Sequence, residues 1–294
     1  MFDYSVVIPA HNEEAGLGRA IESVLAQSVP ATQIIVVDDG STDGTSQVAG
    51  KYGGVHVVRH DVCRGLAQAR NTGIAHAMST WVAFLDSDDW WDEDKIEKQA
   101  TLATATGAGL IYTGMRRVQR AGDHRAEPCP ARVFRNHRAL CRKLLLSNYI
   151  TGSASTVVVR RELLEKVGGF DNTLVVAEDW DLWMRLSQYT TFTAVREPLV
   201  TLLVRSGSLG GNPQRMFEGE KVVLAKNKGM YACYWDGKLL WRHAQARLYE
   251  RLGKGYLMKR QRKDARNCFV RAAVLWPFRL HILVPLAKLL VGAI

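Results

Sequence analysis

The segment "QIIVVDDGSTDGT" (33–45) decides the expected fold, because its apolar run is followed directly by two aspartates and a glycine. Its apolar, β-branched run is typical of a buried strand. Asp38 and Asp39 close that run, and Gly40 permits a tight turn. The following "STDGT" is typical of a helix start whose backbone amides attract anions. The segment therefore predicts a strand, a turn and a helix, with polar groups at the carboxyl end of the strand.

The same alternation extends on both sides of this segment. Apolar runs predict further strands at 4–10, 56–58 and 81–86, and helical spacing of apolar residues predicts helices at 14–27 and 66–78. Short strands that alternate with helices form right-handed βαβ units in a parallel sheet. Open parallel sheets bind their ligands at the carboxyl ends of the strands. We therefore expect an α/β fold with a Rossmann-like, mostly parallel central sheet flanked by helices.

The pattern is looser after residue 105. We expect strands at 110–119 and 154–161, and helices at 161–170 and 177–189. The second of these strands leads directly into the first of these helices, which a Gly-Gly pair closes. From residue 213 onward the chain is almost wholly helical in pattern.

Composition narrows the class of protein. The 294 residues, 47% of them hydrophobic, suffice for one large α/β domain and a smaller appendage. The five cysteines are odd in number and scattered, and none forms a C-x-x-C pair, which argues against a disulfide framework and a zinc site. The start "MFDYSVVIPAHNEE" lacks a basic region and a long apolar run, so we expect no signal peptide. These features favour a reducing, cytoplasmic compartment.

Charge is distributed unevenly along the chain. Residues 1–225 hold 24 Lys and Arg against 26 Asp and Glu, whereas residues 226–294 hold 15 against 3. Such a local basic excess predicts an anionic partner, either membrane lipid or nucleic acid, and no nucleic-acid recognition motif accompanies it. Charged residues and prolines interrupt the apolar C-terminal end, which favours interfacial or core-packed helices over a membrane-spanning one. We expect residues 254–294 to meet an anionic membrane surface, with simple packing onto the α/β domain as the alternative.

Six acids crowd into nine positions of "LDSDDWWDEDK" (85–95). Asp86 and Asp88 follow a strand directly, and hard carboxylate oxygens suit Mg²⁺ or Mn²⁺. The acids at 92–94 suit the first turn of a helix expected to begin near Trp91, because the helix dipole favours negative charge there. The sequence therefore predicts a metal site next to a helix cap, with Asp89 unassigned between them.

Three other groups of polar residues carry candidate chemistry. Asp38 and Asp39 suit hydrogen bonds to a nucleobase or ribose, although a receiver-type phosphorylation site also pairs aspartates at a strand end. Arg70 suits either a phosphate or the organisation of nearby carboxylates, or is simply a surface residue. In "AEDWDLW" (177–183), a carboxylate facing a pocket suits the role of general base, and plain helix-start acids are the alternative.

Five motifs together resemble a known family. They are "VVIPAHNEE", "IIVVDDGSTDGT", "GLAQARNTGI", "VAFLDSDD" and "GGFDNTLVVAEDWDLWMRL", in this order. The set resembles glycosyltransferase family 2, whose members are inverting, nucleotide-sugar-dependent enzymes with a GT-A fold, over roughly residues 1–205. The resemblance implies a GT-A catalytic domain at 1–212, with a nucleotide-binding half (1–105) and an acceptor half (106–212). The remaining residues, 213–294, then form a helical, basic region.

The resemblance also implies site residues. Those matching the nucleotide-binding positions of the family are Pro9, Ala10, His11, Asn12, Glu13, Asp38, Asp39, Arg70, Asp86 and Ser87. Asp88, supported by Asp86, matches the ligand of a Mn²⁺ or Mg²⁺ ion, and Asp179 matches the catalytic base. Those matching the acceptor side or an auxiliary role are Glu178, Trp180 and Trp183.

One position departs from the family. Many relatives carry a His near the metal or phosphate after the last core strand, and in "LLVRSGSLGG" (202–211) Arg205 stands in its place. An arginine does not bind a metal ion but neutralises a diphosphate, so the third metal ligand is in doubt.

The expected activity is that of a glycosyltransferase of the hexosyltransferase type. It transfers a sugar with inversion from a nucleotide-sugar donor, by default a UDP-sugar, to a hydroxyl of a saccharide or lipid-linked saccharide. The expected setting is bacterial cell-surface polysaccharide synthesis, on the cytoplasmic face of the inner membrane. A catalytically silent protein that binds nucleotide sugar is the alternative, whereas the acidic "PAHNEE" (9–14) disfavours a nucleotidyltransferase. The sequence leaves the sugar, the acceptor and the oligomeric state open.

Overall fold

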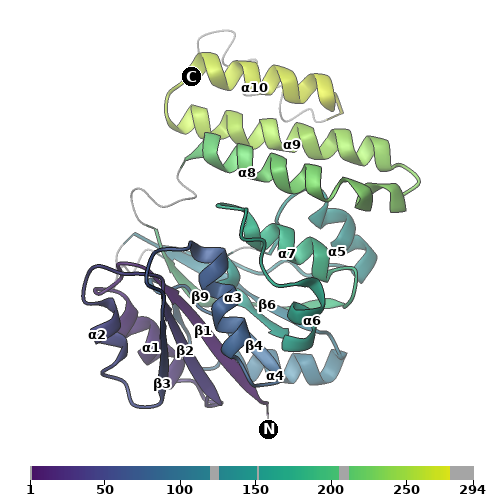
Figure 1. Ribbon diagram of the computed structural model, residues 1–294. Coiled ribbons are helices and arrows are strands. Elements are labelled where there is room, and N and C mark those ends of the chain that lie inside the picture. The colour runs from purple at the N-terminus through teal and green to yellow at the C-terminus, as the bar shows by residue number, and fades with distance from the viewer. Residues whose placement is uncertain (1, 120–125, 151, 205–211, 279–294) are drawn as a thin grey trace. The chain divides into compact units, whose positions relative to one another are not determined.

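The computed structural model describes residues 2–119, 126–150, 152–204 and 212–278 (Figure 1). The chain divides into two compact units. The sheet unit comprises residues 1–140 and 149–205, and the helical unit comprises residues 141–148 and 206–294.

The first half of the sheet is parallel. Its strands are β1 (Tyr4–Ala10), β2 (Gln33–Asp38), β3 (Val55–Arg59) and β4 (Trp81–Phe84), in the spatial order β3-β2-β1-β4. Every neighbouring pair in this series is parallel. The βαβ alternation predicted from the sequence is therefore confirmed, and the carboxyl ends of β1, β2 and β4 lie along one edge of the sheet.

The second half makes the sheet mixed. β8 (Val157–Arg160) pairs antiparallel with both β4 and β6 (Leu110–Val118). β9 (Phe192–Leu203) then runs parallel to β6. Two short strands are antiparallel to their partners: β5 (Trp90–Trp91) pairs with β9, and β7 (Glu127–Cys129) pairs with β6. The expected α/β class is confirmed, with the parallel order concentrated in the N-terminal half.

Helices cover both faces of β1, because its side chains alternate between them. Val6 and Ile8 belong to the same core cluster as the buried face of α1 (Leu17–Leu25). Val7 points the other way, toward α3 (Leu66–His76), where a Cβ at Gly73 would lie 2.2 Å from a Val7 methyl carbon. Glycine therefore lets α3 lie close along the strand (Figure 1).

The sheet unit contains further helices. They are α2 (Thr45–Ala49), α4 (Lys95–Thr106), α6 (Arg161–Val167) and α7 (Glu178–Leu186), with a short 3₁₀ turn at Ala154–Thr156. Of these, α4 packs against β6 and β9. α6 ends at Gly168, whose φ of +77° provides the left-handed closure predicted for it. α5 (His137–Leu144) carries the chain from one unit into the other.

The expected helix start near Trp91 is wrong. Trp90 and Trp91 form β5, which pairs with residues more than a hundred positions away in β9, and α4 begins only at Lys95. A two-residue strand held by so distant a partner leaves no periodic signal of its own in the sequence.

The helical unit contains α8 (Pro213–Lys226), a 3₁₀ helix (Lys228–Cys233), α9 (Gly237–Met258) and α10 (Arg262–Leu275). α8 starts where the sequence predicts, because the Asn212 side chain accepts hydrogen bonds from the first free amides and a proline follows it. α10 packs on α9 through a small apolar cluster. Among the described helices, none combines the length and hydropathy needed to cross a bilayer. Residues 279–294 lie outside the described part.

Candidate active site

The loop after β1 begins with buried residues and ends at the surface. Pro9 and Ala10 are the last residues of β1 and are buried, whereas His11 and Asn12 are exposed. Glu13 is buried again before α1 begins. Of these expected nucleotide contacts, only His11 and Asn12 therefore offer exposed side chains to a ligand.

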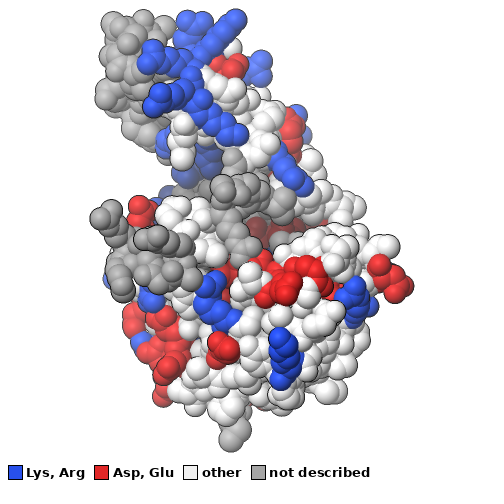
Figure 2. All heavy atoms as spheres, turned by 90° about the vertical axis from the view of Figure 1, so that its left-hand side faces the viewer, with Lys and Arg blue, Asp and Glu red and all other residues white. Residues whose placement is uncertain are grey.

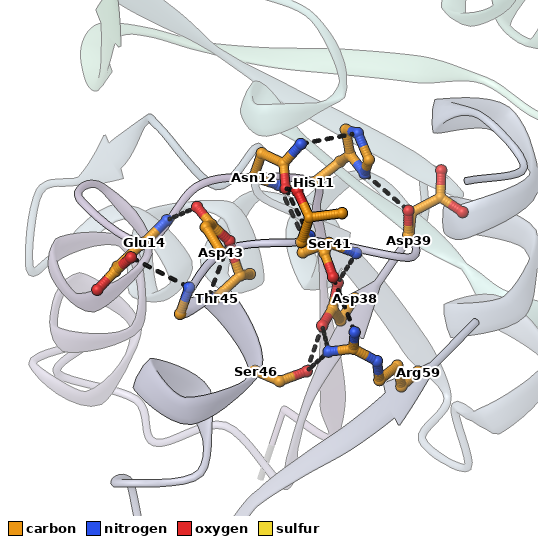
Figure 3. Close-up of polar contacts among 12 residues, drawn as sticks. His11, Asn12, Glu14, Asp38, Asp39, Ser41, Asp43, Thr45, Ser46 and Arg59 are labelled. Atoms are coloured by element: carbon orange, nitrogen blue, oxygen red, sulfur yellow. Dashed lines mark hydrogen bonds and ion pairs between the residues drawn. The ribbon is translucent and has the colours of Figure 1, made fainter. Parts of the chain in front are cut away.

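This loop interlocks with the loop after β2 (Figure 3). Asn12 has a left-handed φ of +51°, and its side-chain oxygen accepts a hydrogen bond from the Thr42 amide at 2.8 Å. The backbone amide of Asn12 donates to the Ser41 hydroxyl at 2.9 Å, and the backbone amide of Glu13 donates to the Thr45 hydroxyl at 2.8 Å. These bonds fix two strand-end loops against each other at the edge where the family motifs meet.

Asp38 is buried and links β3 to the loop that follows β2. Its carboxylate accepts hydrogen bonds from the Ser41 amide at 2.9 Å and from the Ser46 hydroxyl, and pairs with Arg59 at 2.8 Å (Figure 3). Burial alone would raise the pKa of Asp38, but these donors and the positive charge of Arg59 hold it below its usual value. The side chain is fully buried, so the structure uses it internally.

Asp39 holds the loop that follows β3. Its two oxygens accept hydrogen bonds from the amides of Arg64 and Gly65, both at 2.8 Å, and from the Cys63 thiol at 3.3 Å. The Asp39 carboxylate also lies 2.7 Å from the ring of His60. Burial would raise the pKa of Asp39, but the hydrogen bonds outweigh it and hold the pKa below its usual value. Four protein donors therefore surround the carboxylate that the resemblance assigns to the base or ribose.

Arg70 joins two motifs that lie far apart in the sequence. It is fully buried in α3, and its guanidinium donates to Asp86 at the end of β4 and to Glu178 at the start of α7, both at 2.7 Å. A third bond reaches the hydroxyl of Ser153 at 3.0 Å. Burial disfavours the charged guanidinium, but the carboxylates of Asp86, Glu178 and Asp179 keep its pKa above the usual value. Of the three roles considered for Arg70, these contacts favour the organisation of neighbouring carboxylates.

A buried hydroxyl supports the D-x-D loop from below. Ser155 accepts a hydrogen bond from the Asp86 amide at 3.0 Å and donates to the carboxylate of Asp89 at 2.8 Å. Asp89 also accepts a bond from the amide of Leu203, at the end of β9, at 3.3 Å. Burial raises the pKa of Asp89 well above its usual value, and the carboxylates of Asp86 and Asp88 raise it further. Asp89 is thus a structural link between the D-x-D loop and β9.

Sequence reasoning missed Ser153 and Ser155. The run "GSAST" (152–156) was expected only to open a strand, and small hydroxyl residues there carry no distinctive spacing. In the structure the backbone marks this segment, because Gly152 and Ser153 have φ values of +91° and +56°, and the second is uncommon for a residue other than glycine.

The later acids of the cluster make salt bridges rather than a helix cap. Asp92 forms a two-pronged pair with Arg116 of β6, at 2.9 and 2.7 Å. Asp94 occupies the N-cap position of α4, but its side chain pairs with Lys98 at 2.7 Å and caps no backbone amide. Asp92 and Asp94, two of the three acids expected to cap a helix, therefore form ion pairs instead.

The start of α7 presents two neighbouring acids. Glu178 is buried against Arg70, whereas Asp179 is partly exposed and its carboxylate accepts the Trp180 amide at 2.7 Å. Ala177, the residue before them, has a left-handed φ of +61°, an uncommon conformation for alanine. Trp180 and Trp183 are 1% and 0% exposed, so they pack in the core and offer no exposed ring to a ligand.

A comparison with family models decides the family. Residues 5–168 match the model described as Glycosyl transferase family 2. The chain belongs to this family.

Two relatives with descriptive names are glycosyltransferases. A putative teichuronic acid biosynthesis glycosyltransferase, TuaG of Bacillus subtilis, is 40% identical over 114 residues, which cover 37% of this chain and 45% of TuaG. UDP-Glc:α-D-GlcNAc-diphosphoundecaprenol β-1,3-glucosyltransferase WfgD of Escherichia coli is 28% identical over 199 residues, which cover 66% of this chain and 74% of WfgD. This chain therefore matches less than half the length of TuaG.

Solved structures with the same fold are glycosyltransferases. A fragment of S. aureus TarS in complex with UDP-GlcNAc superposes with a TM-score of 0.64 at 16% identity, covering 99% of this chain and 92% of that one. The mannosyltransferase PcManGT from Pyrobaculum calidifontis, in complex with GDP-Man and Mn²⁺, gives 0.61 at 18% identity, covering 99% and 86%. At these identities the likeness shows the GT-A fold alone.

The D-x-D residues of this family 2 chain fit a divalent cation that brings its own ligands. Asp86, Ser87 and Asp88 are partly exposed, and Arg70 engages only one oxygen of Asp86. Within the described ranges, no group of three His, Cys, Asp or Glu is arranged to hold a metal. Two carboxylates suit Mg²⁺ or Mn²⁺ when substrate phosphates and water complete the shell. Arg205, the expected diphosphate contact, lies outside the described residues.

Proposed function

We propose that this protein is an inverting glycosyltransferase that moves a sugar from a nucleotide-sugar donor to a hydroxyl of a saccharide or lipid-linked saccharide. The donor is a UDP-sugar by default, since the name of WfgD and the TarS complex both contain UDP. The GDP-Man complex of PcManGT keeps a guanosine donor as the option to test against it.

One observation carries the proposal. Buried Arg70 binds Asp86 and Glu178, which lie 92 residues apart in the sequence, at 2.7 Å each. This arrangement supports a single site in which donor-side and acceptor-side carboxylates face one another. A fold that only bound nucleotide would have no need of a second acidic motif at that place.

The donor side would use the D-x-D residues. Asp88, supported by Asp86, would hold a Mn²⁺ or Mg²⁺ ion on the donor diphosphate, where its charge favours departure of the nucleotide. His11 and Asn12 are exposed after β1 and would contact the nucleoside. Asp39 acts on the nucleoside indirectly, by fixing the backbone of the loop at 60–65.

The acceptor side would use Asp179. Its carboxylate takes the proton of the acceptor hydroxyl while that oxygen attacks the anomeric carbon from the face opposite the nucleotide. The carbon–oxygen bond to the diphosphate breaks as the new glycosidic bond forms, so the configuration inverts and the nucleotide leaves with the electron pair. Glu178 is committed to Arg70 and is a positioning residue for this step.

The setting follows from the relatives' names. Teichuronic acid biosynthesis and a diphosphoundecaprenol acceptor point to bacterial cell-surface polysaccharide, assembled on a lipid carrier. We place the protein in the cytoplasm, at the cytoplasmic face of the inner membrane.

The test is replacement of Asp179 by Asn. The amide cannot accept the proton, so transfer should fall by about 10²–10⁴-fold, while donor binding measured by calorimetry should change by less than about threefold. Glu162→Gln, on an exposed side chain of α6, is the matched control and should leave both unchanged. UDP-, GDP- and dTDP-sugars with Mn²⁺ or Mg²⁺ identify the donor beforehand.

Two results would overturn the proposal. If Asp179→Asn kept most of the transfer rate, another group would be the base. If the wild type bound a nucleotide sugar yet gave neither transfer nor metal-dependent hydrolysis, the protein would be a silent nucleotide-sugar binder.

A further inference from the structure

α10 has two opposite faces with different partners. One face is buried against α9, and its residues are Ala265, Cys268, Phe269 and Ala272. The other face is exposed and carries a stripe at helical spacing, made of Lys263, Arg266, Val270 and Val274. Residues spaced by three, seven and eleven positions lie on one side of a helix, so these four side chains share one outward direction. We call them the outer stripe.

The positive charge around the outer stripe is not neutralised within the described part of the unit. Three further exposed cations lie just before the outer stripe, and they are Lys259, Arg260 and Arg262, the first residue of α10. Neither these three nor the cations of the stripe form an ion pair with a described residue. The acids of α9 and its cap are already engaged, since Asp236 binds Arg142 and Glu250 binds Lys254.

Only one acid remains near the stripe. Asp264 stands alone among these cations, and no Asp or Glu follows it in the sequence. Figure 2 shows the result, with Lys and Arg gathered on the helical unit and little acidic surface among them. So concentrated a positive charge favours the binding of an anionic partner.

Apolar side chains are exposed beside these cations. Val274 is 70% exposed and Val270 is 45% exposed, at the C-terminal end of the stripe. Met258 at the end of α9 and Phe278 just after α10 are 87% and 78% exposed. Exposed apolar side chains interleaved with cations are typical of a surface that enters the boundary between lipid headgroups and acyl chains.

We propose that the outer stripe and the cations before it form a docking surface for a bilayer containing anionic phospholipid. The cations would meet the lipid phosphates, and Val270, Val274 and Phe278 would enter the headgroup region. A nucleic acid would satisfy the cations but leave these apolar side chains in water, which disfavours it. The surface belongs to the helical unit, so it stands whether or not the sheet unit performs the transfer proposed above.

The test uses the full-length chain and vesicles of defined composition. Vesicles of phosphatidylcholine alone are compared with vesicles containing about one third phosphatidylglycerol, and bound protein is measured by flotation. We expect binding only to the anionic vesicles, weakening as salt screens the charges. Lys263→Glu with Arg266→Glu should lower the partition coefficient by about 30-fold or more.

The apolar contribution is tested separately. Val270→Ser with Val274→Ser keeps the charge and should lower the partition coefficient by about fivefold, at low and high salt alike. The charge-matched control is Lys51→Glu with Arg117→Glu, two exposed cations of the sheet unit, and it should bind like the wild type. Circular dichroism and thermal midpoints identify any variant that fails to fold.

Three outcomes would overturn the proposal. One is equal flotation of the stripe variant and the wild type. Another is an equal loss in the control variant, which would assign binding to net charge alone. The third is tight binding of a single-stranded oligonucleotide by the wild type with no effect of the Val270→Ser and Val274→Ser changes on vesicle binding, which would identify a nucleic-acid surface.

Discussion

Two acidic pairs stand at carboxyl ends of parallel strands in the sheet unit, and the fold treats them differently. Asp38 and Asp39, after β2, are 0% and 3% exposed and accept hydrogen bonds or ion pairs from seven protein groups. Asp86 and Asp88, after β4, are partly exposed, and Asp86 receives one guanidinium on one oxygen. The first pair is used to hold loops, and the carboxylates of the second are partly exposed at the surface.

The difference shows that an acid at a strand end is not by itself a ligand site. What distinguishes the two pairs is the supply of donors from the following segments. The loop after β3 turns four donors toward Asp39, whereas Asp86 receives only the Arg70 guanidinium from the described residues, and its backbone amide donates to the Ser155 hydroxyl. The burial of each carboxylate and its count of protein donors therefore predict its role better than its place in a motif.

The sharpest contrast is expected for Asp88→Asn. If Asp88 binds the ion on the donor diphosphate, the Asn replacement should lower the transfer rate by about 10³-fold or more, because the negative charge on the leaving group is no longer offset. The thermal midpoint should change by less than about 2 °C, since the side chain is partly exposed. Retention of activity with an unchanged metal requirement would contradict the assignment.

Asp38→Ala should show the reverse pattern. Removing this carboxylate leaves the Ser41 amide and the Ser46 hydroxyl without their acceptor, and Arg59 without its ion pair. We expect a loss of about 2–4 kcal/mol in the free energy of unfolding, measured by urea titration. Asp61→Ala, at an exposed acid of the loop after β3, serves as the control and should leave the stability unchanged. A fall in activity at unchanged stability would instead make Asp38 a ligand-binding residue.

Local pattern predicted most of the parallel half. β1 spans Tyr4–Ala10 as expected, and β2 and β4 lie within two residues of their expected ends, because buried β-branched runs are a strong signal. The polar groups at those strand ends were also found, since parallel topology brings them to one edge. These features depend on short stretches of chain and on one topological rule.

Features set by distant partners were not predicted. The pairing of Arg70 with Glu178 joins positions 108 residues apart, and β5 exists only because β9 returns beside it. Ser155 is a small hydroxyl residue whose importance comes from its hydrogen bonds to Asp86 and Asp89. Such contacts are properties of the packed tertiary structure, and no local period or composition encodes them.

Ser155→Ala tests whether the second acidic pair depends on its support. The change removes the acceptor of the Asp86 amide and the donor to Asp89, so the D-x-D loop should be less well positioned. We expect the Mn²⁺ or Mg²⁺ concentration for half-maximal activity to rise about tenfold, with a loss of about 1–2 kcal/mol in stability. Ser28→Ala, at an exposed hydroxyl, is the control. Lower stability at an unchanged metal requirement would show that Ser155 only stabilises the fold.

The smallest effect concerns acid stability and the first pair. Hydrogen bonds hold the folded-state pKa of Asp39 below its usual value near 4, despite the opposing effect of burial. A depressed carboxyl pKa stabilises the fold fully above the unfolded-state value, and this contribution is lost as pH falls below about 4 through the folded-state value. The difference in unfolding free energy between wild type and Asp39→Asn should therefore shrink between pH 7 and about pH 3. His60 and Cys63 are the titratable groups that touch Asp39, so the same comparison in a His60→Gln background separates their influence. A difference that stays constant with pH in both backgrounds would mean that the carboxylate charge does not contribute, and that the first pair holds its loops by hydrogen-bond geometry alone.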